Sequence, residues 1–158
     1  MQVPITPVQY PTLADLATQV GKELAISDWT MVDQATINLF ADATGDRNWI
    51  HVDIPRAAND APFGGTIAHG FLILSLIAQP LQSCIQVASV HMGVNYGLNK
   101  VRFITPVRAG QRVRCRMMLM ALDGIANGAQ ATWQVTVEQE GQDKPACVAE
   151  VLIRLYEQ

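Results

Sequence analysis

Residues 68–82 read AHGFLILSLIAQPLQ, and this stretch decides the fold. From Phe71 to Ala78 the side chains are apolar on nearly every side of a helix, which predicts a helix buried all round rather than one with a wet face. Pro80 either ends or kinks that helix, because proline has no amide hydrogen and clashes with the preceding turn. We expect this segment to be the central helix of the domain.

After this segment the apolar period changes from 3.6 to 2. Four strands are expected near residues 94–104, 111–122, 129–139 and 146–156, separated by the turn sequences TPVRAG, DGIANG and EGQDKP. Alternating apolar positions in VRCRMMLM and TWQVTVEQ allow one sheet face to cover the helix. The pattern predicts an α+β fold, with an antiparallel sheet wrapped around the central helix in one domain over residues 1–158.

The first half of the chain is expected to add smaller elements. Thr12 is placed to cap a helix over TLADLATQVGKEL, and a short strand is predicted at residues 29–32. Asp33 is placed to cap a second helix, DQATINLFADAT, which Gly45 stops. From Gly45 to Gly65 the density of Gly, Pro, Asn and Asp indicates an irregular segment that can display polar side chains.

Composition excludes several functional classes. The net charge is −3 and the basic residues are scattered, which disfavours a nucleic-acid partner. The N-terminus lacks the pattern of a signal peptide, and no apolar run approaches the roughly 20 residues of a membrane span, so we expect a soluble cytoplasmic protein. Cys84, Cys115 and Cys147 have neither disulfide nor zinc-site spacing and are expected to be reduced core thiols.

The polar segment carries a carboxylate and an imidazole five residues apart. In FADATGDRNWIHVD these are Asp46 and His51, with Asn48 between them, and such a pair performs general acid-base chemistry when both groups face one water. Gly70 opens the apolar helix, where free N–H groups suit a carbonyl oxygen that becomes negative. Without a Cβ, Gly70 lets that carbonyl come close.

The order of three segments carries a family resemblance: FADATGDRNWIHVD, then IAHGFLILSL about a dozen residues later, then NYGLNKVRFITPVRAGQRVR. In this order the chain closely resembles the MaoC-like or (R)-specific enoyl-CoA hydratase family, and it looks closest to the NodN-like branch of single-domain members. The resemblance implies a hot-dog fold, a homodimer and an acyl-thioester tunnel near the subunit interface. It also implies that Asp46 and His51 are the catalytic pair, that Asn48 is the intervening Asn, and that the Gly70 N–H holds the thioester carbonyl.

One departure from the family pattern concerns the catalytic loop. Many members have Pro after the Asn, whereas Trp49 and Ile50 stand between Asn48 and His51 here. The difference bears on acyl-chain preference more than on the reaction, because both polar partners keep their spacing.

The implied reaction is the reversible syn addition of water to a trans-2-enoyl-CoA. Asp46 and His51 hold the water, take its proton as C3–O forms, and deliver a proton to C2, while the Gly70 N–H stabilises the enolate oxygen. The product is an (R)-3-hydroxyacyl thioester. No metal or organic cofactor is needed, since the thioester itself acidifies C2.

Each residue also has a structural interpretation. Asp46 can cap a turn, His51 can bond the backbone, and Gly70 can serve close helix packing. Asn48 can shape its own loop, and His69 more often holds the start of the helix than contacts ligand. We expect His91 to be a surface or loop residue, and Ser75 and Cys84 to be packing residues, because neither lies in a nucleophile signature. A solvated face is expected for four basic residues, of which one or two could bind CoA phosphates: Lys100, Arg102, Arg108 and Arg112.

Two other functions stay open at this stage. A hot-dog acyl-CoA thioesterase usually has an Asp or Glu on or beside the central helix, and residues 70–79 contain none. A non-catalytic acyl-CoA or acyl-carrier binding protein would keep the tunnel without the reaction. The retained Asp46 and His51 favour the hydratase.

Overall fold

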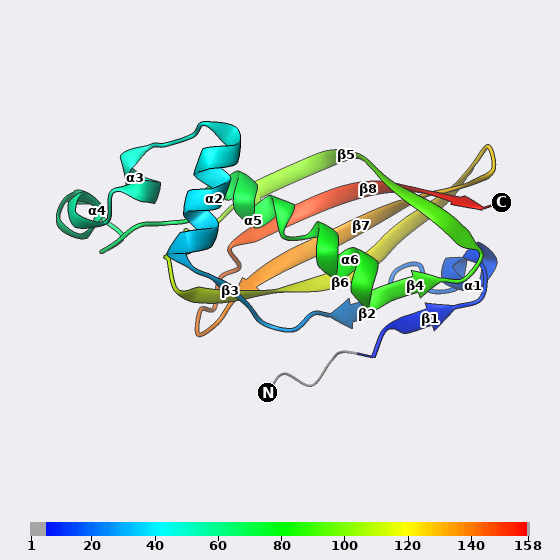
Figure 1. Ribbon diagram of the computed structural model, residues 1–158. Coiled ribbons are helices and arrows are strands. Elements are labelled where there is room, and N and C mark those ends of the chain that lie inside the picture. Colours follow the sequence, from blue (N-terminus) through cyan, green and yellow to red (C-terminus); the bar gives the residue numbers. More distant parts are fainter. Residues whose placement is uncertain (1–5, 158) are drawn as a thin grey trace.

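A computed structural model describes residues 6–157 as one long antiparallel sheet with helices along one face (Figure 1). The strand order is β2-β6-β7-β8-β5, and β3 also pairs with β6. These strands are β2 Glu23–Ile26, β3 Thr30–Val32, β5 Val90–Phe103, β6 Gln111–Ile125, β7 Gly128–Gln139 and β8 Cys147–Glu157. The α+β prediction and all four predicted C-terminal strands are therefore confirmed, although β5 begins several residues earlier than expected.

The central helix is present but interrupted. It consists of α5 Gly70–Ser75 and α6 Ala78–Cys84, which are separated by a turn at Leu76 and Ile77. Pro80 cannot donate a hydrogen bond to the carbonyl of Leu76, so the break lies one turn before the proline. The prediction of a helix buried all round was wrong for Phe71, whose side chain is 69% exposed, because the sheet covers only one side of the helix within one chain.

The predicted helix over residues 12–24 is also shorter than expected. Only α1 Leu13–Ala17 is helical, closed at its start by the Thr12 capping box. Gly21 has a left-handed φ of 85° and its N–H bonds the carbonyl of Leu119 at 2.7 Å, which directs the chain into β2. Pairing of β2 with β6 thus overrides the local helical pattern. A small parallel pair of β1 Val8–Tyr10 and β4 Ile85–Val87 was not predicted.

The elements around the polar segment agree with the sequence. The Asp33 side chain caps α2 Gln34–Thr44 by accepting the Thr36 N–H at 2.8 Å, and Gly45 ends the helix with a φ of 77°. Two short helices follow, α3 Trp49–Val52 and α4 Ile54–Asp60. In Figure 1, α2, α3 and α4 lie at one end of the sheet, and α1, β1 and β4 lie at the other.

The core lies between the helices and the inner face of the sheet. Its fully buried side chains include Leu16 from α1, Ile37 from α2, and Leu119 and Val135 from the sheet. The three cysteines are buried and free, as expected, and burial raises the pKa of Cys115 to about 12 and that of Cys147 to about 11. No helix in residues 6–157 has the length and apolar character needed to cross a membrane.

Candidate active site

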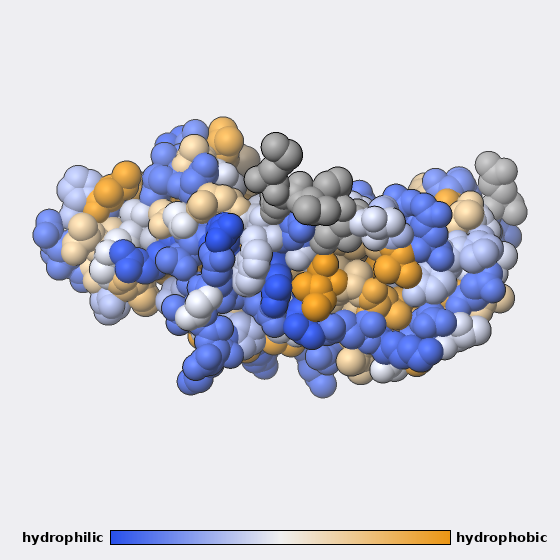
Figure 2. Space-filling model, turned by 90° about the horizontal axis from the view of Figure 1, so that it is seen from below, coloured by the Kyte–Doolittle hydropathy of each residue, from blue (hydrophilic) through white to orange (hydrophobic). Residues whose placement is uncertain are grey.

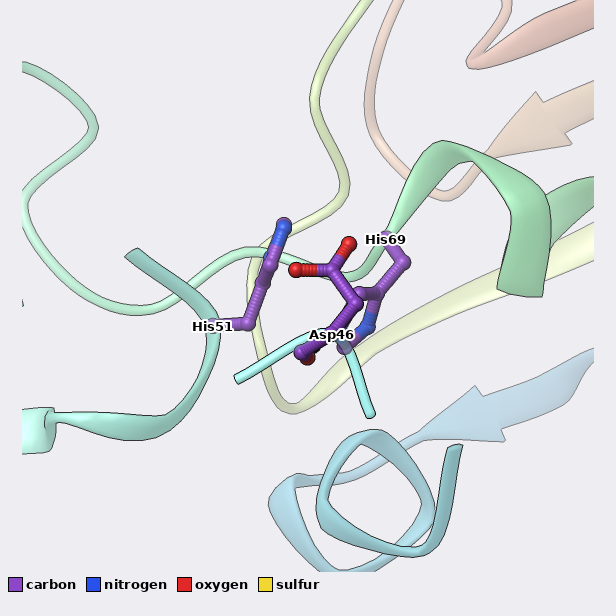
Figure 3. A group of neighbouring side chains, drawn as sticks. All are labelled: Asp46, His51 and His69. Atoms are coloured by element: carbon purple, nitrogen blue, oxygen red, sulfur yellow. Dashed lines mark hydrogen bonds between the residues drawn. The ribbon is translucent and has the colours of Figure 1, made fainter. Parts of the chain in front are cut away.

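Three polar side chains from separate segments meet at the end of the sheet that carries α2 and α3. Asp46 follows the Gly45 turn, His51 lies in α3, and His69 is the residue just before α5. One side-chain oxygen or nitrogen of each lies within 4.8 Å of the others. In Figure 3 the Asp46 carboxylate and the end of the His51 ring point to the same side. The predicted pair is therefore brought together, and His69 joins it.

The surroundings of His51 favour its neutral form. Its side chain is only 7% exposed, and its Nδ1 lies 2.7 Å from the carbonyl oxygen of Ile67. A carbonyl can only accept, so Nδ1 donates and Nε2 keeps a free lone pair. Burial lowers the pKa of His51 below its ordinary value of 6.5, because the charged imidazolium loses hydration. The structural interpretation of His51 and the catalytic one are thus compatible.

A glutamine side chain links the His51 segment to α2 and to the chain before α5. The side-chain nitrogen of Gln34, on α2, donates to the His51 carbonyl at 2.8 Å, and its oxygen accepts from the Thr66 hydroxyl. The N–H of Ile67 also donates to the carbonyl of Ile50 at 3.0 Å. These bonds fix α3 between α2 and the chain that leads into α5. Sequence reasoning did not identify Gln34.

Asp46 is exposed, and its local bonds shape the loop. Its Oδ1 accepts the Asn48 N–H at 3.3 Å, and its backbone carbonyl accepts from His69 Nε2 at 2.9 Å. The Asn48 side chain in turn accepts the Ile50 N–H at 3.4 Å as the cap of α3. The bond between Asn48 and Ile50 therefore supports a loop-shaping role for Asn48, while contact with substrate stays a prediction.

A cavity of about 270 Å³ opens beside this group. His51 and Gly70 line it together with the apolar side chains of Ile73 and Phe103. A larger cavity, of about 810 Å³, lies toward the other end of the sheet, where β1, β4 and the start of β5 meet, and none of the three polar residues lines it. His91 lines this larger cavity and is exposed. We take the smaller cavity as the candidate site, because His51 and Gly70 both line it and the Asp46 carboxylate lies beside His51.

Gly70 is in close contact with an aromatic ring. A Cβ added to Gly70 would lie 2.7 Å from Cδ2 of Phe103, so the glycine makes room for this ring. As the first residue of α5, Gly70 also has an N–H without an intrahelical partner. Close packing and carbonyl binding are therefore both compatible with this position, and its role as thioester donor stays a prediction.

The same three side chains are poorly arranged for a metal ion. The rings of His51 and His69 are stacked, with centroids 3.8 Å apart and planes 26° apart. The nitrogen lone pairs lie in these two nearly parallel ring planes, whereas the lone pairs of two ligands must converge on one ion at about 2.0–2.1 Å. Acid-base chemistry fits this geometry better than coordination does.

The remaining candidates have structural partners. Cys84 is buried, as predicted for a packing residue, but the same prediction was wrong for Ser75, which is exposed because it lies on the outer side of α5. The Ser75 hydroxyl donates to the carbonyl of Phe71 at 2.7 Å. Arg112 forms an ion pair with Glu140, which accounts for it as part of a solvated face. The Arg108 guanidinium donates to the carbonyl of Gly64 at 2.8 Å. A role for Lys100, Arg102 or Arg108 in binding CoA phosphates stays a prediction.

Comparison with known proteins defines the class. The chain belongs to the family of proteins with a MaoC-like domain, whose family model matches residues 15–142. It is 50% identical over 146 residues to a Mycobacterium tuberculosis protein named 3-hydroxyacyl-thioester dehydratase Z, covering 92% of this chain and 96% of that protein. It is 49% identical over 142 residues to nodulation protein N of Rhizobium leguminosarum, covering 87% of each. The predicted family resemblance is confirmed.

Solved structures confirm the fold. The R-hydratase PhaJ1 of Pseudomonas aeruginosa superimposes with a TM-score of 0.72 at 24% identity, covering 94% of this chain and 88% of that one. A monoamine oxidase regulatory protein from Archaeoglobus gives a TM-score of 0.77 at 23% identity, covering 98% and 99%. The hot-dog fold expected from the sequence is thus the fold of this chain.

Proposed function

We propose that this protein is an (R)-specific enoyl-CoA hydratase, which in the reverse direction is a 3-hydroxyacyl-CoA dehydratase. The observation that carries the proposal is the placement of the Asp46 carboxylate within 4.8 Å of a ring nitrogen of His51, which lines a cavity together with Gly70. Family membership and the half-identical dehydratase relative make the protein a hydro-lyase that acts on an acyl thioester. The (R) configuration and the CoA carrier are parts of the proposal.

The reaction adds one water molecule without a redox change. Asp46 and His51 both accept hydrogen bonds, so they can orient one water through its two hydrogens. As the water oxygen bonds C3, the pair takes its proton, the alkene electrons move toward the thioester carbonyl, and the oxyanion faces the Gly70 N–H. Return of a proton to C2 on the same face completes the addition. We propose that no metal or organic cofactor takes part.

Crotonyl-CoA tests the proposal directly. Loss of the absorbance of the conjugated thioester, with formation of (R)-3-hydroxybutyryl-CoA and no free thiol, is the expected result. Release of free CoA would instead identify a thioesterase. An unchanged spectrum would show that the protein is at most a non-catalytic acyl-CoA binding protein. The helices α5 and α6 carry no Asp or Glu, which favours the hydratase.

We further propose a homodimer formed through β5. This strand is at the end of the sheet order and pairs only with β8 among the described strands. Its exposed apolar side chains include Met92, Val94, Tyr96 and Leu98, which are 42% to 54% exposed. An open apolar strand edge is readily covered by a second copy through strand pairing.

The dimer can be tested by placing a charge on that edge. Leu98→Asp is expected to shift the protein from dimer to monomer, because the carboxylate would be buried between the two copies of β5. Light scattering coupled to size-exclusion chromatography measures the mass. Met120→Asp, at an equally exposed position on β6 away from that edge, should leave the dimer intact. A monomeric wild-type protein would contradict the proposal.

The proposed location is the cytoplasm. Three buried cysteines without disulfides are typical of proteins from a reducing compartment. A CoA thioester substrate is consistent with that location.

The state of His51 predicts the pH dependence. Because burial lowers the pKa of His51 below 6.5, the neutral ring, which can accept a proton, predominates at that pH. We expect the acid limb of kcat/KM for crotonyl-CoA to be centred below pH 6.5, with a decline of about tenfold per unit well below the His51 pKa. A pH profile with its acid limb centred above 6.5 would contradict a neutral His51 as the base.

A further inference from the structure

His69 is more buried than either proposed catalytic group and contacts both. Its side chain is 3% exposed, and its ring stacks on His51 at a centroid distance of 3.8 Å. The ring of Phe40, from α2, lies 5.0 Å away at 51°. In Figure 3 the His69 ring lies beside the Asp46 backbone, at the start of α5. His69 therefore occupies the space between α2, α3 and α5.

The hydrogen bond of His69 fixes the main chain of Asp46. Its Nε2 lies 2.9 Å from the Asp46 carbonyl oxygen, and since a carbonyl only accepts, Nε2 must carry the hydrogen. Asp46 otherwise stands in an exposed loop directly after the left-handed Gly45. This bond joins that loop to the residue just before α5, some twenty residues further along the chain.

The other nitrogen of His69 has no structural use in the described part of the chain. With Nε2 protonated, Nδ1 is a bare acceptor, and it is buried without a hydrogen-bond partner among residues 6–157. An unpaired buried acceptor costs folding free energy. A residue needed only to pack against His51 and Phe40 would be better served by an apolar ring. The histidine thus carries a cost that stability alone does not explain.

We propose that His69 is a positioning residue of the active site: its Nε2–H holds the Asp46 backbone while its ring supports the His51 imidazole, so that the carboxylate and His51 Nε2 face one water. This inference rests on the proposed hydratase function. His69 touches neither water nor substrate in this role. It acts through the two residues that do.

Two variants separate the donor from the ring. His69→Phe keeps an aromatic ring against His51 but removes the donor to Asp46, whereas His69→Gln keeps a donor nitrogen at nearly the same reach and removes the ring. We expect His69→Phe to lower kcat for crotonyl-CoA about tenfold with KM little changed, because a misplaced catalytic group costs rate rather than affinity. His69→Gln should recover part of that loss.

Thermal unfolding distinguishes positioning from a structural role. His69→Phe removes the unpaired buried nitrogen, and Asp46 belongs to an exposed loop in which water can replace the lost bond, so the melting temperature should equal or exceed that of the wild type. Lower kcat in an equally stable protein supports the proposal. Wild-type kcat in His69→Phe, or a kcat loss matched by a large fall in melting temperature, would overturn it.

Ring NMR tests the same geometry without turnover. The chain has only three histidines, so their ¹⁵N ring signals can be assigned by single substitutions. At neutral pH we expect His51 as the Nδ1–H tautomer and His69 as the Nε2–H tautomer. A His69 ring protonated at Nδ1 but not at Nε2 would refute the anchor to Asp46 whether or not crotonyl-CoA is hydrated. An inactive wild-type enzyme with the expected tautomers would instead refute the substrate assignment.

Discussion

Asp46→Asn and His51→Gln are each expected to lower the rate of crotonyl-CoA hydration by at least about a hundredfold, the usual contribution of a positioned acid or base. Asparagine keeps the size of the Asp46 side chain and one acceptor oxygen but cannot take a proton. Glutamine at position 51 removes the imidazole Nε2, the lone pair left free by the Ile67 bond. The measurement is the initial rate of absorbance loss at saturating substrate.

A third variant tests whether misfolding causes the loss of hydration activity. In His51→Asn the amide nitrogen stands near the place of Nδ1 and can still donate to the Ile67 carbonyl, so the segment should keep its fold while the base is lost. Asp42→Asn and His91→Gln remove the same residue types at exposed positions outside the proposed pair, and both should retain wild-type rates. Hydration at near-wild-type rates in Asp46→Asn and His51→Asn would end the proposed mechanism.

Local sequence patterns predicted the fold well where short-range rules decide it. The Asp33 cap, the Gly45 stop and the period-2 strands depend on neighbours in the chain, and all of them are present, although β5 begins earlier than predicted. The helix over residues 12–24 failed because β2 pairs with β6, about ninety residues away. Such pairing energy is invisible to a helical apolar pattern. The break before Pro80 was recognisable in kind but not in position.

The sequence predicted which residues of the candidate site lie close together, but not the contacts that hold them in place. Asp46, His51 and Gly70 follow from the motif, and their closeness was the main expectation. The carbonyl of Ile67 that fixes the His51 tautomer, the Gln34 bridge and the ring of Phe103 come from distant parts of the chain. No pattern in the sequence links these positions to the loop. His69 had a signal, its place just before Gly70, but its double contact required coordinates.

Gly70→Ala is expected to lower kcat/KM by up to about a hundredfold, the cost of a displacement of about 1 Å at a catalytic site. The new Cβ would stand 2.7 Å from a ring carbon of Phe103, closer than two such carbons can approach, so the ring must move. Phe103 lines the same cavity as His51 and is 48% exposed, which lets it swing without unfolding the chain. Steady-state kinetics and thermal unfolding measure the two effects separately.

A double-mutant cycle tests whether the Phe103 ring causes the loss of activity in Gly70→Ala. Adding Gly70→Ala to Phe103→Ala should cost far less activity than adding it to the wild type, because the contact that the new methyl violates is already gone. Gly124→Ala provides the matched control, since a Cβ at Gly124 meets nothing within 4 Å. If Gly70→Ala reduces activity equally in both backgrounds, the methyl acts on the thioester carbonyl at the start of α5 rather than through Phe103. Unchanged activity in the single variant would contradict both explanations, since either one requires the space at Gly70 to stay empty.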